Sequence, residues 1–506
     1  MFLYNTLTKT KEKLIPRLRG AEARYGEAKA RHPSTSSGQA KVQMFVCGPT
    51  VYDYAHIGNA RSFVFFDVVA KYIRSQGYEV DYIQNITDID DKIIKRAQEA
   101  GREPLDWAKE YTEKFLEDMK ALGVDSPKYA PATEYIEQVV KQVKTLIDKG
   151  HAYLIEGDPE KSGDLETGGW YFDLSTFKDY GKLSGRTTQM ADDGVSRIDE
   201  NDKKRNKGDF CLWKISKEGE PAWDFETAKM ARASLGKNVG RPGWHIEDTA
   251  ITEHFFGPQY DIHGGGQDLI FPHHEAEITQ QESASGKKPF VKYWMHVAFL
   301  VNKEQKMSKS LGNFEIARDL LKKYSKETLR FYLLSGHYRQ PLEFNEKVLR
   351  QSEAATNRLA EFISKINLIK ESRSSTNNAY AENVDDRIKK AEKDYQEAMD
   401  NDFNTPEAFA AIFEMIRIIN PFLAENKVSG KQAQEITELL KEIDGITGVI
   451  PSEQQKIPSE IEELVEKREK FRQEKNYEES DKIRAQLHEL GYNIEDTAYG
   501  PLIMRI

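Results

Sequence analysis

The stretch from residue 41 to residue 86 constrains the fold most, because it alternates strand-like and helix-like segments. KVQMFVCG at 41–48 is an apolar run with strand character, and ARSFVFFDVVAKYIRSQG at 60–77 has the length and apolar spacing of a helix. YEVDYIQNI at 78–86 is again strand-like, and DDKIIKRAQEAG then begins another helix. This alternation predicts a parallel α/β sheet, in which ligands lie at the carboxyl ends of the strands.

Three residues with useful chemistry follow these strand-like runs, namely Cys47, His56 and Thr87. Cysteine is scarce in this chain, because Cys47 and Cys211 are the only two. Two cysteines give no disulfide framework, which favours a cytoplasmic location. Cys211, in GDFCLWK, is interpreted as a buried apolar residue.

The composition bounds the remaining possibilities. A chain of 506 residues is too long for one domain, so three or four are expected. The net charge of −10 argues against a protein that coats nucleic acid non-specifically, although local basic patches can still bind it. No apolar run approaches the ~18 residues of a membrane span, and the first residues lack the order of a secretory signal.

The composition and the apolar pattern change along the chain. Residues 17–40 are basic and then rich in Ser, Thr and Gly, which predicts a surface insertion, and residues 225–238 are expected to form a second one with helical character. From about residue 345 apolar residues recur at helical spacing to about residue 450. After a proline-marked break, 453–506 predicts two helices and a short final segment.

Two short motifs carry phosphate chemistry. His56-Ile57-Gly58-Asn59 places an imidazole and backbone N–H groups at the start of a helix, where a phosphate can bind, although a structural histidine is the default for such a tetrapeptide. Lys306 and Lys309, in KMSKS, have the charge to neutralise a triphosphate, and alone they fit a solvated basic loop equally well. The presence of both motifs in one chain, in this order, argues against a chance match.

The pair of motifs resembles the signature of class I aminoacyl-tRNA synthetases. More segments resemble the cysteinyl-tRNA synthetase family: CGPTVYDYAHIGNAR, NITDIDDKII, GRPGWHIE, DIHGGGQDLIFPHHEAEI, KMSKSLGN, HYRQPLEF, NDFNTPEAF and DKIRAQLHELGYNIEDT. The resemblance implies that L-cysteine is activated with ATP to an adenylate and then transferred to the terminal ribose of tRNA(Cys). It also implies one Zn²⁺ that distinguishes thiol from hydroxyl, and Mg²⁺ with the ATP.

The resemblance assigns roles to individual positions. The zinc ligands would be Cys47, Asp248, His273 and Glu277; the first, third and fourth match the family, whereas Asp248 stands in GWHIED where the family has Cys. Carboxylate is a competent zinc ligand, so two readings stay open: a retained site with Asp248 as ligand, or a weakened or lost site. His273 and Glu277 are four apart and would share a helix face.

Further roles follow from the same resemblance. The residues implied to bind ATP, or to stabilise its phosphates during catalysis, are His56, Gly58, Asn59, Gly265, Asp268, Lys306 and Lys309. Those implied to line the cysteine pocket or approach substrate are Thr87, Trp244 and His263, with a core aromatic as the alternative for Trp244. Asp88, Asp90 and Asp91 are expected to cap and support a helix.

The expected architecture is α/β: a Rossmann-type parallel-sheet catalytic domain at 1–300 with a connective insertion at about 119–205. A linking fold at 301–340 carries KMSKS, followed by a tRNA-binding helical bundle at 341–452 and an anticodon-reading domain at 453–506. That last segment has basic residues, or equally a solvated helix face: Arg468, Arg472, Lys475, Lys482 and Arg484. We expect a monomer that contacts no membrane.

Two rival functions remain open at this point. A related ligase that joins cysteine to an amino sugar would share the catalytic core, but it would not need the 453–506 segment. A synthetase-like protein that binds RNA without catalysis would need neither motif intact, and the departure at Asp248 leaves it open.

Overall fold

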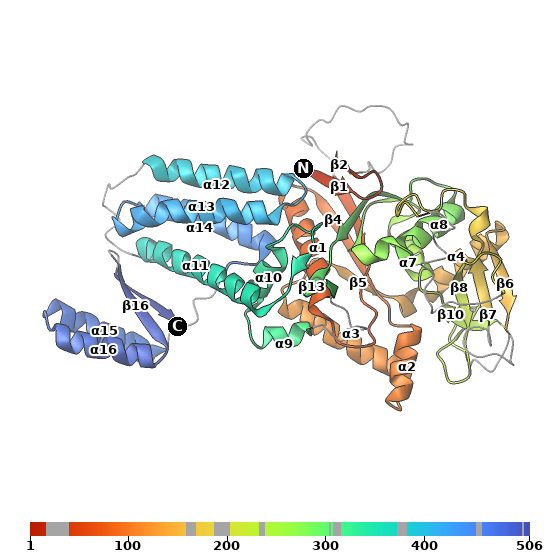
Figure 1. The fold of residues 1–506 in the computed structure, drawn as a ribbon, viewed down its shortest axis with the longest axis horizontal. Coiled ribbons are helices and arrows are strands. Elements are labelled where there is room, and N and C mark those ends of the chain that lie inside the picture. Colours follow the sequence, from red (N-terminus) through yellow and green to blue (C-terminus); the bar gives the residue numbers. More distant parts are fainter. Residues whose placement is uncertain are drawn as a thin grey trace. The chain divides into compact units, whose positions relative to one another are not determined.

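The predicted parallel sheet is present, with strands in the order β12-β11-β3-β4-β5. Figure 1 labels two of these strands, β4 and β5. All neighbouring strands pair in parallel. Their bounds are β3 (Lys41–Val46), β4 (Glu79–Ile86), β5 (Lys128–Pro131), β11 (Tyr260–Gly266) and β12 (Val291–Val297). The chain moves from β3 to β4 on one side, whereas β11 lies on the other. The strand order therefore reverses at β3, and ligands bind at the carboxyl ends beside such a reversal.

The protein is seen here in a computed structural model. It describes residues 1–16, 40–157, 168–186, 203–231, 238–302, 305–306, 315–371, 382–451, 458–497 and 500–505. The predicted insertion at 17–40 lies outside these residues except for Ala40. The chain divides into two compact units, Met1–Lys323 with Tyr338–Glu343, and Tyr324–His337 with Phe344–Ile506.

Helix α1 (Ile57–Ser75) lies against β4, β11 and β12 and is buried along almost its whole length. His56 caps its first turn, because Nδ1 of the imidazole accepts a hydrogen bond from the N–H of Asn59 at 3.3 Å. Close packing on β11 requires a glycine, since a Cβ at Gly264 would lie 2.3 Å from the ring of Phe66. The helix thereby delivers its N-terminus to the strand reversal.

Further helices and a short hairpin belong to the first unit. The helices are α2 (Asp91–Glu99), α3 (Pro104–Ala121), α4 (Ile136–Asp148), α7 (Ile246–Phe256) and α8 (His273–Ser285). Asp90 caps α2 by accepting from the N–H of Lys92 at 2.8 Å, which confirms its expected capping role. A hairpin of β1 (Phe2–Asn5) and β2 (Thr10–Lys13) joins β12 through hydrogen bonds of Asn5 to Lys292 and Trp294.

A second, antiparallel sheet is inserted in the first unit, with strands in the order β6-β7-β8-β10-β9. The strands are β6 (Ala152–Glu156), β7 (Gly168–Phe172), β8 (Phe210–Ile215), β9 (Trp223–Asp224) and β10 (Val239–Pro242). The predicted bounds of the insertion, about 119–205, are wrong at both ends. Residues 128–131 pair with the main sheet as β5, and the inserted sheet extends to residue 242. Cys211 is buried beside Tyr153 and Tyr171, as its apolar interpretation predicted.

The segment at 225–238 does not show its predicted helix in the residues that are described, 225–231 and 238. Asp224 instead accepts hydrogen bonds from the backbone N–H groups of Glu226 and Thr227, and from the Thr227 hydroxyl. Ala228 adopts a positive φ of 55°. A carboxylate that satisfies the backbone of a turn competes with helix formation, so residues 225–231 are not helical. Residues 232–237 of the predicted segment lie outside the described residues.

The segment that follows the main sheet is tied back to α1. It contains β13 (Leu300–Asn302), β14 (Gln305–Lys306), β15 (Leu342–Glu343) and helix α9 (Ala317–Leu321). Arg61, which is 1% exposed, donates to the carbonyls of Ala298, Phe299 and Gln340 at 2.8–3.0 Å. Each of these bonds involves a buried cation, so together they fix α1 against β13 and the chain before β15.

The second unit is helical, as the periodicity from residue 345 predicted. Its helices are α10 (Lys326–Leu334), α11 (Glu346–Glu371), α12 (Glu382–Asp400), α13 (Thr405–Ala424) and α14 (Gly430–Thr447). Residues 324–337 belong to this unit although the predicted boundary lay at 340, because Arg330 donates to the carbonyl of Thr447 at 2.7 Å. Among the helices described, none has the length and apolar content to cross a membrane.

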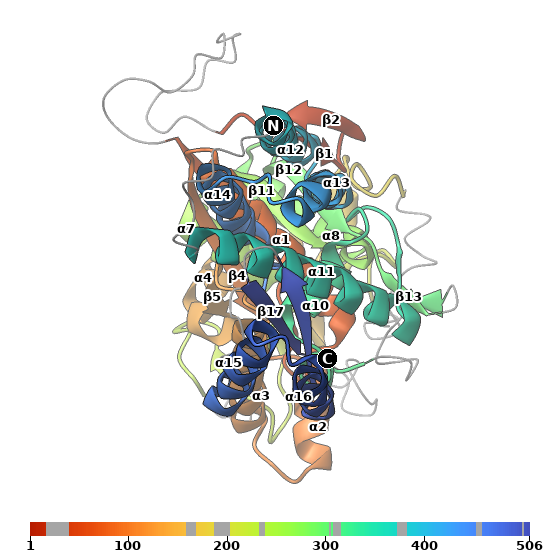
Figure 2. The same cartoon turned by 90° about the vertical axis from the view of Figure 1, so that its left-hand side faces the viewer.

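The C-terminal segment forms two helices that lie side by side and a hairpin (Figures 1 and 2). They are α15 (Ser459–Gln473), α16 (Tyr477–Glu489), β16 (Tyr492–Thr497) and β17 (Gly500–Arg505). Arg468 was counted among the basic residues available to RNA, but it is 1% exposed and donates twice to Asp496, at 2.8 and 2.9 Å. Its role is to pin the hairpin to α15, and it is not free for a phosphate.

Candidate metal centre and ligand cavity

A cavity of about 760 Å³ opens at the carboxyl end of β3, where the strand order reverses. Its size lies within the range usual for small-molecule sites, about 300–1,000 Å³. Of the residues predicted from sequence, those that line it are Cys47, His56, Gly58, Asn59, Thr87, Trp244, Asp248, Asp268 and His273. The structure therefore gathers most of both predicted groups around one space.

One wall of the cavity is the N-terminus of α1. His56, Gly58 and Asn59 lie there, so the positive end of the helix dipole faces the space. The chain after KMSKS returns to the same place: Ile57 N–H donates to the carbonyl of Glu315 at 2.9 Å, and His56 and Ile316 form a β-bridge. The described chain that follows KMSKS is thus anchored beside His56 through Glu315 and Ile316.

The floor of the cavity is a buried cluster of Cys47, Asp248, His273 and Glu277. Sγ of Cys47 lies 3.3 Å from Asp248 Oδ2 and 3.7 Å from Glu277 Oε1. His273 Nε2 lies 3.0 Å from the same Asp248 oxygen and 2.9 Å from the same Glu277 oxygen. The structure therefore brings together all four predicted ligands, with donor atoms within 4.8 Å of one another.

These distances fit a tetrahedral metal ion. Bonds of about 2.0–2.3 Å to sulfur, nitrogen and oxygen would place neighbouring donors about 3.3–3.7 Å apart. The four contacts of 2.9–3.7 Å are close to that range, so an ion would need to push the donors apart only slightly. The donor set of one thiol, one imidazole and two carboxylates suits a borderline-soft divalent ion.

Asp248 is held so that one oxygen faces the cluster. Its Oδ1 accepts a hydrogen bond from Asn85 Nδ2 at 2.5 Å, which leaves Oδ2 towards Cys47 and His273. Asn85 is itself fixed, because its Oδ1 accepts from the N–H of Gly48 at 2.6 Å. A Cβ at Gly48 would lie 1.8 Å from the Asn85 carbonyl oxygen, so only glycine permits this approach. The carboxylate is oriented as a ligand that uses one oxygen.

The charges in the cluster call for a cation. Burial, together with the carboxylates of Glu277 and Asp248, raises the pKa of the Cys47 thiol well above its ordinary value. Burial alone would lower the pKa of His273, but Glu277 and Asp248 raise it to about 10. A proton on His273 is thus stabilised where a metal ion would otherwise sit, and an ion there would favour the thiolate form of Cys47.

Three other predicted residues, Thr87, Trp244 and His263, differ in their positions relative to the cavity. Thr87 lies at the cavity and donates its hydroxyl to Glu247. Trp244 is 40% exposed, and its ring lies tilted beside that of His273 with centroids 4.8 Å apart, so the alternative of a core aromatic is wrong. His263 is fully buried and does not line the cavity.

The remaining predicted positions lie farther back or outside the described residues. Gly265 does not line the cavity; a Cβ there would lie 2.8 Å from the ring of His274. Lys306 is described only by its backbone, which pairs with Val301 between β14 and β13. Lys309 lies outside the described residues.

Sequence reasoning missed several residues of the site: His274, Asn85, Glu247 and His245. His274 had a signal, because it stands three positions before Glu277 and shares its helix face. His245 Nδ1 lies 2.7 Å from His273 Nδ1, which turns Nε2 of His273 towards the cluster. The sequence spacing of Asn85 and Glu247 does not predict their contacts, because their partners are distant in the sequence.

Models of known protein families match most of the chain. Residues 33–354 match the family described as tRNA synthetases class I (C) catalytic domain. Residues 394–450 match the DALR domain, and residues 454–499 match the cysteinyl-tRNA ligase anticodon binding domain.

Individual relatives extend this agreement. The chain is 41% identical over 506 residues to the cysteine–tRNA ligase of Carboxydothermus hydrogenoformans, covering 99% of each chain. It is 39% identical over 513 residues to that of Clostridioides difficile, covering 100% of each. These matches confirm the resemblance inferred from the motifs.

Among solved structures the chain is similar to Mycobacterium tuberculosis methionyl-tRNA synthetase bound by methionyl-adenylate. The TM-score is 0.59 at 15% identity, covering 80% of this chain and 92% of that one. An Agrobacterium radiobacter LeuRS–tRNA–LeuAMS complex gives a TM-score of 0.58 at 12% identity, covering 82% and 85%. At these identities the likeness concerns the fold, and it confirms the predicted α/β catalytic fold followed by helices.

Asp248 provides the most specific test of the metal centre. Asp248→Ala removes a ligand, so its affinity for divalent metal should be lower than that of the wild type. The decrease should exceed the about 10–100-fold that results from losing a hydrogen bond to a metal ligand. Asp248→Cys should bind metal more tightly than the wild type, since thiolate is the softer ligand. Equilibrium competition with a chromophoric chelator measures both affinities.

Asp148→Ala is the matched control, because Asp148 is exposed at the end of α4, away from the cluster. Its affinity for metal should equal that of the wild type. If Asp248→Ala keeps wild-type affinity while remaining folded, Asp248 is not a ligand.

Proposed function

Since the chain belongs to the cysteine–tRNA ligase family, we propose that its ATP-dependent joining of cysteine to tRNA takes place in the cavity at the end of β3, on the buried cluster around Cys47. The single observation that carries this proposal is the convergence of both predicted groups on one cavity. The N-terminus of α1 forms one wall, and Cys47, Asp248 and His273 form the floor. An adenylate spanning the two would place its phosphate at the helix and its side chain at the cluster.

The first half of the reaction is positioning and charge stabilisation, without a protein nucleophile. The carboxylate of L-cysteine attacks the α-phosphate of ATP, and pyrophosphate leaves. His56, Gly58 and Asn59 bind phosphate at the helix N-terminus, where the dipole favours negative charge. Lys306 and Lys309 bind the departing pyrophosphate, and Mg²⁺ accompanies the ATP. The chain after these lysines is next described at Glu315 and Ile316, where Ile316 forms a bridge with His56.

The cysteine side chain is selected at the floor of the cavity. Cys47, Asp248, His273 and Glu277 would hold one Zn²⁺, which binds thiolate far more strongly than hydroxyl and lowers the pKa of a thiol. Trp244, whose ring lies beside that of His273, and Thr87 close this end of the cavity around the substrate. His263 was expected in this pocket, but it contacts Cys47 instead of lining the cavity, and its Nε2 lies 3.2 Å from Sγ of Cys47.

The second half of the reaction transfers the acyl group to the terminal ribose of tRNA(Cys). We assign tRNA contact to the helices of the second unit and anticodon recognition to 453–506, supported by the match of 454–499 to an anticodon binding domain. With Arg468 buried, the predicted cations of this segment that remain exposed are Lys475, Lys482 and Arg484, and Lys482 pairs with Glu478 and Glu479. Exchange of such surface pairs for phosphates costs little free energy.

The two rival functions have less support. A ligase that joins cysteine to an amino sugar would not need the C-terminal segment, yet 454–499 match an anticodon domain. An RNA-binding protein without catalysis would not need the cavity or the retained ligand geometry at Asp248. Neither has an observation of its own in its favour.

Cysteine-dependent exchange of pyrophosphate into ATP tests the catalytic assignment. Lys309→Ala should lower the exchange rate by about 10²–10³-fold, because one charge contact to the leaving pyrophosphate is lost. Lys322→Ala is the matched control: Lys322 is exposed, pairs with Asp319 at 2.7 Å and should leave exchange unchanged. Near-normal exchange by Lys309→Ala would show that Lys309 does not contribute to the reaction.

Removal of residues 453–506 separates activation from transfer. The segment has a small core of its own, formed by Ile461, Val465, Ile483, Leu487 and Ile494, and all residues of the cavity lie upstream. The truncated protein should retain pyrophosphate exchange but charge tRNA(Cys) at least tenfold more slowly at limiting tRNA, as expected if about 1.4 kcal/mol or more of binding free energy is lost. Charging at the full-length rate would refute the anticodon-reading role.

A further inference from the structure

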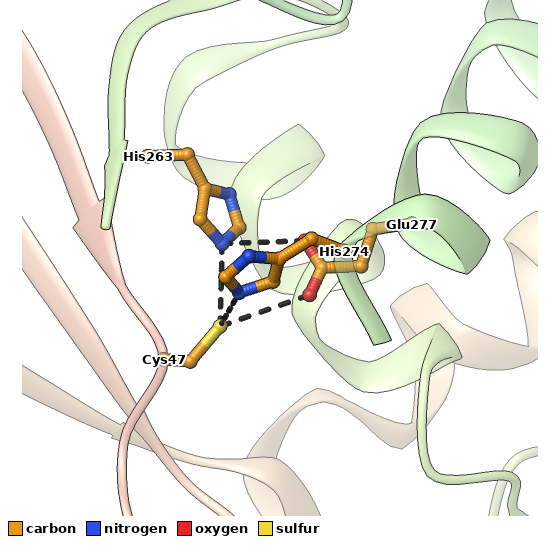
Figure 3. A group of neighbouring side chains, drawn as sticks. All are labelled: Cys47, His263, His274 and Glu277. Carbon is orange, nitrogen blue, oxygen red and sulfur yellow. Dashed lines mark hydrogen bonds and ion pairs between the residues drawn. The ribbon is translucent and has the colours of Figure 1, made fainter. Parts of the chain in front are cut away.

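Cys47 also faces a second group of donors, formed by His263, His274 and Glu277 (Figure 3). Its Sγ lies 3.2 Å from Nε2 of His263 and 3.1 Å from Nε2 of His274. Neither histidine lines the cavity, whereas Asp248 and His273 do. One donor atom each of Cys47, His263, His274 and Glu277 lies within 4.8 Å of the others, and all four residues are buried.

The two oxygens of Glu277 point to different groups. Oε1 lies 2.9 Å from His273 Nε2, in the first cluster. Oε2 lies 3.3 Å from His263 Nε2, in the second, and it accepts no hydrogen bond among the described residues although the side chain is fully buried. A buried carboxylate oxygen without a hydrogen bond is costly, and a bound cation is an ordinary explanation for one.

The two histidines are oriented as metal-bound histidines are. Nδ1 of His263 lies 2.5 Å from the hydroxyl of Tyr260, and Nδ1 of His274 lies 2.8 Å from Nε2 of His296. The chain of contacts continues from Nδ1 of His296 to Oγ1 of Thr6 at 2.8 Å. When Nδ1 of each ring donates to these partners, each Nε2 presents its lone pair to the space beside Cys47. Outer hydrogen bonds of this kind fix the ring and tautomer of histidine ligands.

We propose that Cys47, His263, His274 and Glu277 form a second metal position for a borderline-soft divalent cation such as Zn²⁺ or Co²⁺, adjacent to the first. One thiolate, two imidazoles and one carboxylate make a full tetrahedral set for such an ion. The proposal rests on the proposed function, because the first position shares Cys47 and Glu277 with the second.

The shared ligands define how two ions would be arranged. Cys47 Sγ bridges them, and Glu277 binds the first ion through Oε1 and the second through Oε2. Two ions bridged in this way lie about 3.5–4 Å apart, as in other two-metal centres. Cys47, Asp248 and Glu277 supply three negative charges when ionised, which one divalent cation compensates only in part; the second ion would complete the compensation.

Metal stoichiometry of the full chain tests the second position. The purified protein is stripped with a chelator, titrated with Co²⁺ or Zn²⁺ alone, and analysed by plasma mass spectrometry. The wild type should saturate near two equivalents, whereas His274→Gln and His273→Gln should each saturate near one. His254→Gln is the matched control, because His254 is exposed on α7 outside both groups, and it should remain near two.

X-ray absorption of the zinc-loaded protein gives an independent readout. The wild type should show a metal–metal distance of about 3.5–4 Å that is missing in His274→Gln. His296→Gln serves if His274→Gln does not fold, as judged by circular dichroism. It keeps every ligand but removes the outer partner of His274, and it should weaken the second ion by about 10–100-fold while the first stays bound.

The possible outcomes separate the two positions. Saturation of the wild type at one equivalent, unchanged in His274→Gln or His296→Gln and lost in His273→Gln, would overturn the second position and leave the first intact. Saturation at no equivalents would overturn both. Two equivalents that persist in every histidine variant would place the second ion elsewhere and equally overturn the proposal.

Discussion

The structure depends on the compensation of negative charge around one buried sulfur atom. The fold brings the Cys47 thiol and the carboxylates of Asp248 and Glu277 together at the end of β3, where the side chains are at most 6% exposed. Ionised groups buried without a partner cost several kcal/mol each, so the cluster in its ionised form favours a bound cation. In the protein alone a proton on His273 supplies it, and a metal ion would do so with more charge.

This requirement explains why distant parts of the chain converge. Cys47 comes from the end of β3, Asp248 from α7, and His273 and Glu277 from α8. The strand reversal at β3 makes the place where they meet also the place where α1 presents its N-terminus. A single position in the sheet therefore brings the N-terminus of α1 and the sulfur-containing cluster to one cavity.

Much of this could be predicted from sequence, because it depends on local patterns. The alternation over 41–86 predicts the parallel strands and α1, and the spacing of His273 and Glu277 predicts a shared helix face. The limits of the inserted sheet could not be predicted, since β5 pairs through contacts remote in sequence. The same holds for Asn85, which orients Asp248 across 163 positions, and for Arg468, whose burial depends on Asp496. Such residues are recognised only when the chain is folded.

The most direct test of the account compares cysteine with serine in pyrophosphate exchange, for the metal-loaded and the metal-stripped protein. Shape alone separates such near-isosteric side chains by about 10–200-fold. The account predicts that the loaded protein prefers cysteine by more than about 10³-fold, and that stripping the metal lowers the preference to the range of shape alone or abolishes activation. A stripped protein that contains no metal yet keeps a preference above about 10³-fold would contradict it.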